Sequence, residues 1–136
     1  MTINQLSFAG ILVILTIAMR YGLSTLLENM EFNMAWLVVA TYAISVFAAG
    51  WFLGKKEYES LPLYDIGFKF HLITYLVCNL IGEFWFLLGF QSQVESIKSV
   101  HLTALFWGIG LIIHFILYLF ARKDSIRGIE KSEIFD

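Results

Sequence analysis

Charged residues and proline are scarce in this chain of 136 residues. Only 15% of the residues are charged, 59% are hydrophobic, and the single proline is Pro62. A soluble domain of this size needs more polar surface, so the composition excludes a soluble globular protein. Because the long apolar runs contain no proline, each of them can form an uninterrupted helix.

Basic residues and cysteine are scarce as well. Nine Lys and Arg residues against eleven Asp and Glu leave a net charge of −2, which predicts no interface for nucleic acid. Cys78 is the only cysteine, so no internal disulfide can form, and we expect it to serve in packing. The first apolar run has no Lys or Arg before it and no small-residue cleavage site after it, so we expect a retained helix rather than a signal peptide.

Four apolar stretches are about 20 residues long, enough to cross a hydrocarbon core roughly 30 Å thick. They are approximately Leu6–Leu27, Met34–Leu53, Phe68–Phe90 and Val100–Ala121. The connecting loops are short, so consecutive helices are expected to be antiparallel neighbours. The sequence therefore predicts an all-α integral membrane protein: one four-transmembrane antiparallel helical bundle over 1–136, with a cytoplasmic tail at 122–136.

Basic residues are distributed unevenly between the two sides of the predicted bundle. The second loop and the tail carry seven: Lys55, Lys56, Lys69, Arg122, Lys123, Arg127 and Lys131. The opposite side has only Lys98, apart from Arg20 inside a span. By the positive-inside rule both termini face the cytoplasm, in a bacterial inner (plasma) membrane. The acidic residues of the second loop, Glu57, Glu59 and Asp65, are expected to be solvated.

Polar residues inside the predicted spans are the candidates for function, because ionisable side chains in a bilayer are costly. Seven are singled out: Arg20, His71, Tyr75, Asn79, Glu83, Trp107 and His114. Four of them recur at every fourth position of the third span and form a polar stripe on one face: His71, Tyr75, Asn79 and Glu83. The fourth span carries a matching row at helical spacing: Trp107, Gly110, His114 and Tyr118.

Depth along the helices suggests which of these residues meet. Arg20 and Glu83 are expected roughly 10 Å below the outer surface, and we predict that they form an ion pair. His101 could also approach Glu83. At the inner side, antiparallel packing brings His71 and His114 to a similar depth, so the two imidazoles could meet.

Three interpretations of the histidine pair are open. The rings can act as hydrogen-bonding groups between helices. They can bind a metal or a b-type haem, although neighbouring helices about 8–10 Å apart leave no room for a porphyrin between them, so haem needs diagonal helices or a second subunit. They can also titrate as a switch near the cytoplasmic surface. We expect no cofactor and no metal, with haem b as the less favoured alternative.

The second half of the chain carries a recognisable combination of residues. Phe70-His71-Leu72 with Tyr75 and Asn79 is followed by Trp107-Gly108-Ile109-Gly110-Leu111 and His114. Over 67–121 this resembles the bacterial two-transmembrane (2TM) domain family, a helical hairpin found alone or fused to some sensor histidine kinases. The chain departs from the family by an additional hairpin, Leu6–Leu53, and by Glu83. The resemblance implies topology and a sensory or docking role, and it implies no reaction.

Glycines offer packing sites of their own. Gly108 and Gly110 lie on different faces and are expected to let two neighbouring helices approach, whereas Gly50 and Gly54 have the spacing of a dimerisation motif.

The sequence contains no nucleophile beside a base and no phosphate-binding loop, so we expect no enzyme. The favoured function is a non-catalytic sensory or protein-docking module in the lipid bilayer, with a possible cytoplasmic or membrane protein partner. The alternatives are an oligomeric pore, ion channel or membrane-disrupting effector formed by self-association, and a haem-dependent electron-transfer protein.

Overall fold

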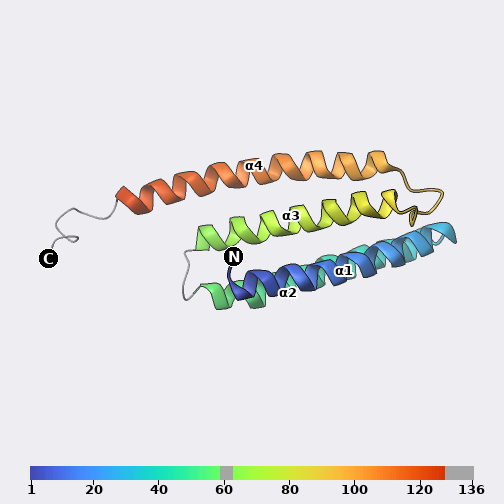
Figure 1. Cartoon of the computed structure of the whole chain (residues 1–136), viewed down its shortest axis with the longest axis horizontal. Helices are drawn as coiled ribbons and strands as arrows, with labels where there is room; N and C mark the ends of the chain where they lie inside the picture. The colour runs from blue at the N-terminus through green and yellow to red at the C-terminus, as the bar shows by residue number, and fades with distance from the viewer. Residues whose placement is uncertain (59–62, 128–136) are drawn as a thin grey trace.

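The computed structural model describes residues 1–58 and 63–127, which form four helices. These are α1 (Ile3–Glu28), α2 (Phe32–Glu57), α3 (Leu63–Leu87) and α4 (Ile97–Arg127). All four are long and apolar enough to cross a membrane, which confirms the prediction of an all-helical, multi-pass membrane protein. Figure 1 shows them lying side by side along one common direction.

The helices form an open array rather than a closed ring (Figure 1). Helix α1 packs against both α2 and α3, α2 touches α3 only lightly, and α4 packs against α3 alone within the described residues. The chain is therefore built of two helix pairs, α1–α2 and α3–α4. The contact between α1 and α3 is what mainly joins them.

The central helix, α1, buries one face. Its buried residues, Gln5, Phe8, Leu12, Thr16 and Ser24, recur at intervals of three, four or eight and so lie on one side of the helix. Phe8 and Leu12 form the apolar core with Ile66 and Phe70 of α3, and the rings of Phe8 and Phe70 lie 4.7 Å apart. This core lies near the end of the bundle where α2 and α3 are connected.

Two helices end in the same backbone motif. After α3, Gly89 adopts a φ of 74°, its N–H donates to Phe86 O, and the N–H of Phe90 donates to Trp85 O. After α1, Met30 takes the equivalent position with a φ of 59°. The backbone conformation of Gly89 therefore ends α3 at Leu87. The predicted third span ended at Phe90, because the residues around Gly89 are apolar and gave no sign of a helix end.

Helices α2 and α4 are longer than the second and fourth spans predicted from apolar length. Helix α2 continues past Leu53 to Glu57, and the Glu57 carboxylate accepts hydrogen bonds from Thr2 and Asn4 at the start of α1. Glu57 is only 2% exposed, so its prediction as a solvated loop residue was wrong.

Two further predictions concern the acidic residues of the second loop and the tail at 122–136, and the structure departs from both in part. Asp65 lies in the first turn of α3, where it pairs with Lys69, and Glu59 lies outside the described residues. Helix α4 extends to Arg127, so the predicted tail begins as helix. Its remainder, 128–136, is not among the described residues.

Candidate functional site

Three helices meet through hydrogen bonds at the middle of α1. The Thr16 hydroxyl, 1% exposed as a residue, donates to Leu12 O and lies 2.9 Å from the Tyr42 hydroxyl of α2. The Tyr42 hydroxyl lies 2.9 Å from Cys78 Sγ of α3. Cys78 therefore takes part in packing, as predicted, and the contact ties α1, α2 and α3 together.

Arg20 does not pair with Glu83. Its guanidinium lies 3.6 Å from the carboxylate of Glu95 in the α3–α4 loop, and both side chains are largely buried, at 16% and 8% exposure. The guanidinium rests on Gly82 of α3, where an added Cβ would lie 2.9 Å from Arg20 Nη2. The predicted pair with Glu83 is wrong, because the loop folds back over α1 and supplies the Glu95 carboxylate instead.

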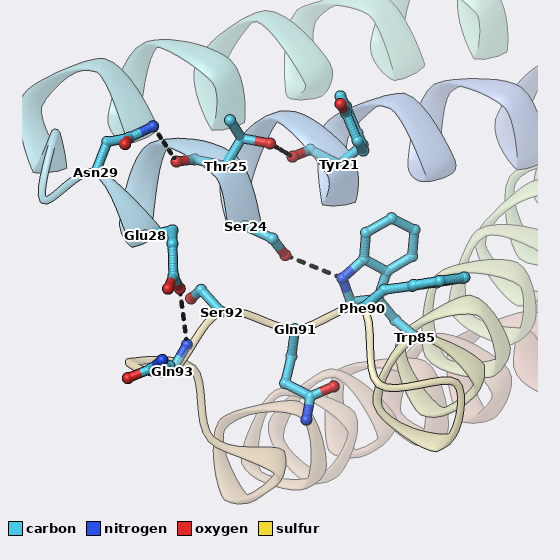
Figure 2. Close-up of a pocket in the computed structure, with 10 residues that line it drawn as sticks. All are labelled: Tyr21, Ser24, Thr25, Glu28, Asn29, Trp85, Phe90, Gln91, Ser92 and Gln93. Carbon is cyan, nitrogen blue, oxygen red and sulfur yellow. Dashed lines mark hydrogen bonds between the residues drawn. The ribbon is translucent and has the colours of Figure 1, made fainter.

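Glu95 connects this loop to two helices. Its carboxylate accepts hydrogen bonds from the Ser24 hydroxyl (2.6 Å) and the Ser92 backbone N–H (2.8 Å). Ser24 in turn accepts one from the indole N–H of Trp85 on α3 (2.9 Å), as Figure 2 shows. Hydrogen bonds to a buried carboxylate satisfy a charge that would otherwise be costly to desolvate. The network therefore fixes the loop against α1 and α3.

A cavity of about 680 Å³ opens beside this network, at the end of the bundle where α3 and α4 are connected. Figure 2 shows Glu28 of α1 meeting the backbone N–H of Gln93 across its rim, with Trp85 and Phe90 on the opposite wall. The rings of Trp85 and Phe90 pack edge to face, with centroids 5.2 Å apart. Aromatic side chains beside polar loop atoms are typical of a membrane–water interface.

Glu83 pairs with His101 of α4 instead, as the alternative prediction had it. The carboxylate and imidazole lie 3.0 Å apart, and both side chains are exposed, at 48% and 60%. The pair therefore faces outward from the array rather than into it.

The two remaining histidines meet between α3 and α4. His71 Nδ1 and His114 Nδ1 lie 3.0 Å apart, which confirms that the two imidazoles lie at a similar depth. The indole N–H of Trp107 donates to His71 Nε2 at 2.6 Å. Trp107, His71 and His114 thus form one hydrogen-bonded chain, here called the imidazole chain.

Trp107 determines the direction of every hydrogen bond in the imidazole chain. An indole nitrogen can only donate, so His71 Nε2 accepts and the proton of a neutral His71 ring is on Nδ1. That N–H donates to His114 Nδ1, which places the proton of a neutral His114 on Nε2. His114 Nε2 lies beside Gly67, where an added Cβ would be 3.6 Å away, and no described residue accepts its hydrogen bond. Within the described part of the molecule, the chain therefore ends in a donor that has no acceptor.

The pair does not fit a haem held between the two rings of one chain. Their centroids are 5.3 Å apart, and both nitrogens of His71 already have partners. A porphyrin plane would require the two rings to separate. Among the described residues, no group of three His, Cys, Asp or Glu side chains could hold a metal ion.

Tyr75, the next residue of the polar stripe, packs against α4, whereas Asn79 bonds within α3. Gly108 lets α4 approach Tyr75, whose hydroxyl would lie 3.2 Å from an added Cβ. Asn79 donates to the Tyr75 carbonyl within its own helix. An added Cβ on Gly110 would meet no atom within 4 Å among the described residues, so no second helix of this chain packs there.

A groove of about 830 Å³ runs between α2 and the α3–α4 pair. Phe8 and Phe70 line it together with Gly50 and Trp51 of α2, and His71 and His114 line it from the other side. The free donor of His114 lies in this region. Gly50 and Gly54 lie against Phe8 and Ile66 of their own chain, so these glycines serve the fold.

Sequence reasoning missed the roles of Glu95 and Glu57, two carboxylates that the described part of the chain buries. Both stand in short polar segments, where composition indicates solvent exposure. The available signal was on α1: Thr16, Arg20 and Ser24 mark a polar face that needs partners, and the loop beyond α3 was a possible source. Comparison with protein-family models, curated proteins and solved structures gave no match.

The first prediction concerns the partner of Arg20. Glu95→Gln should lower the free energy of unfolding by about 2–4 kcal/mol, because it leaves a buried guanidinium without its counter-charge. Glu83→Gln should cost less than about 1 kcal/mol, because its pair is exposed. Denaturation of the detergent-purified protein with sodium dodecyl sulfate measures both. A large loss for Glu83→Gln that disappears in an Arg20→Met background would contradict this pairing.

The second prediction concerns the imidazole chain. With ¹⁵N-labelled histidine at a pH where the rings are neutral, NMR should show the Nδ1–H tautomer for His71 and the Nε2–H tautomer for His114. Trp107→Phe removes the indole donor, so His71 should populate both tautomers and stability should fall by about 1 kcal/mol. Tyr21→Phe, on the exposed surface of α1, is the control. An Nε2–H tautomer at His71 in the unsubstituted protein would refute the chain.

Proposed function

We propose that this chain is a non-catalytic, multi-pass protein of the bacterial inner membrane that acts as a sensory or docking module. Its four helices cross the bilayer in alternating directions, with both termini in the cytoplasm. The distribution of Lys and Arg supports this orientation. The partial resemblance of 67–121 to the 2TM family supports the same role.

The observation that carries the proposal is the position of α4. This helix packs against α3 alone within the described residues and presents the rest of its circumference outward. Large apolar side chains cover that outward face, among them Phe106 at 70% exposure and Phe120 at 61%. A helix held on one side only is a surface onto which another transmembrane helix can pack. Docking therefore takes place on α4.

The arrangement of the polar stripe favours docking over conduction. His71 and Tyr75 face α4 within the chain, and Asn79 bonds to its own helix, so these side chains serve packing. An aqueous path requires polar side chains that face a shared opening. In this chain that requirement is not met by the stripe.

One observation favours the alternative, an oligomeric pore. The Glu83–His101 pair lies outward, with both side chains about half exposed, and ionisable groups on the membrane face of a helix usually have a partner. Contact between copies through this pair would build a ring with a polar lining near one surface. Self-association is thus the competing function.

Photo-cross-linking in native membranes tests the docking role. The photo-reactive residue p-benzoylphenylalanine replaces Phe106 on α4 or, as a control, Trp36 on α2, which is 75% exposed. We expect a discrete adduct with another protein from position 106 and none from 36. An adduct of twice the 15.6 kDa chain mass would support the pore alternative, and no adduct from either position would contradict docking on α4.

A further inference from the structure

The groove between α2 and the α3–α4 pair has two chemically different ends. At one end lie Lys55 and Tyr58, in the last turn of α2 and just beyond it. At the other lie Val46 and Phe47, with Thr74, whose hydroxyl donates to the Phe70 carbonyl of its own helix. Polar and cationic groups thus face one end of the groove, and apolar groups fill the other.

His114 belongs to the polar end. An added Cβ on Gly54 would touch Ile66, and one on Gly67 would touch His114 Nε2, each at 3.6 Å. Because Ile66 and Gly67 are consecutive residues of α3, His114 lies near the level of Gly54, the residue before Lys55. The free N–H of the imidazole chain and the Lys55 ammonium are therefore at the same end of the groove.

The length and shape of the groove fit an extended chain. From Val46 to Tyr58 the groove follows α2 for twelve residues, or roughly 18 Å at the helical rise. Glycine at positions 50 and 54 keeps the α2 wall low, and Phe8 and Phe70 form the floor. Its volume of about 830 Å³ lies within the roughly 300–1,000 Å³ typical of small-molecule sites.

The charges identify the occupant further. Lys55 has no ion-pair partner among the described residues, whereas Lys69 pairs with Asp65 and the Glu57 carboxylate already accepts from Thr2 and Asn4. The groove is also open at the side, because Phe47 and Trp51 on its rim are 70% and 64% exposed. Its occupant can therefore enter from the bilayer and should carry a negative charge at one end.

We infer that this groove binds one anionic phospholipid. An acyl chain lies along Gly50 over the rings of Phe8 and Phe70, and the phosphate pairs with the Lys55 ammonium. The N–H of His114 donates to an oxygen of the headgroup or ester. The site rests on the membrane placement proposed above, with Lys55 at the cytoplasmic leaflet, and is independent of docking on α4.

Native mass spectrometry of the delipidated protein tests the site. The protein in detergent is offered equal amounts of dioleoyl phosphatidylglycerol and dioleoyl phosphatidylcholine, which differ in headgroup charge but share their acyl chains. We expect one phosphatidylglycerol to be retained in preference. Lys55→Gln should reduce that preference about fivefold, the effect of one cation near a lipid phosphate. Lys56→Gln, the matched control, should leave it unchanged, because Lys56 does not line the groove.

A second variant tests the path of the acyl chain. Gly50→Leu adds a side chain to the groove, and its Cβ would lie at an ordinary 3.7 Å from Phe8, so the fold should tolerate it. It should reduce retention of both lipids. Equal effects of Lys55→Gln and Lys56→Gln would overturn the headgroup position, and unchanged binding by folded Gly50→Leu would overturn the acyl position. Because the assay uses purified protein alone, its outcome is separate from that of the cross-linking experiment.

Discussion

The fold depends on the hydrogen-bonded contact of Thr16, Tyr42 and Cys78, where three helices meet. The two helix pairs are joined mainly by α1 against α3, since α2 touches α3 lightly and the backbone of α4 approaches neither α1 nor α2 closely within the described residues. In a bilayer no water competes for polar groups, and apolar contact between helices gains little over contact with lipid. A polar contact at the middle of α1 therefore fixes which helices are neighbours and at what height.

The other buried polar groups follow from that register. With α1 held against both α2 and α3, Thr2 and Asn4 reach Glu57 of α2 at one end, and Arg20 and Ser24 reach Glu95 of the α3–α4 loop at the other. Each end is thus closed by a buried carboxylate, while α4 is added through its own contacts with α3. The same register leaves open the groove between α2 and the imidazole chain, with Phe8 of α1 on its floor.

The sequence predicted the helices well because their signal is local. Apolar length identified four spans, and the spacing of His71 and His114 placed the two rings at one depth. The pairing of the charged residues depends instead on the path by which each loop returns to the helices. Helical periodicity gives no information about that path. Arg20 was assigned to Glu83 by depth alone, whereas the α3–α4 loop carries Glu95 back to it. Glu57 looked solvated for a similar reason, because its partners are some fifty residues away in the chain.

A disulfide between α1 and α3 tests the central contact most directly. Thr16 Oγ1 lies 3.9 Å from Cys78 Sγ, so Thr16→Cys places a second thiol beside the natural one. Mild oxidation should then form an intramolecular bridge that protects both thiols from maleimide, whereas Ile14→Cys, on the exposed face of α1, should form none. If the thiols of Thr16→Cys stay reactive, or bridge only between separate chains, then α1 does not pack on α3 as described and the account of the fold is wrong.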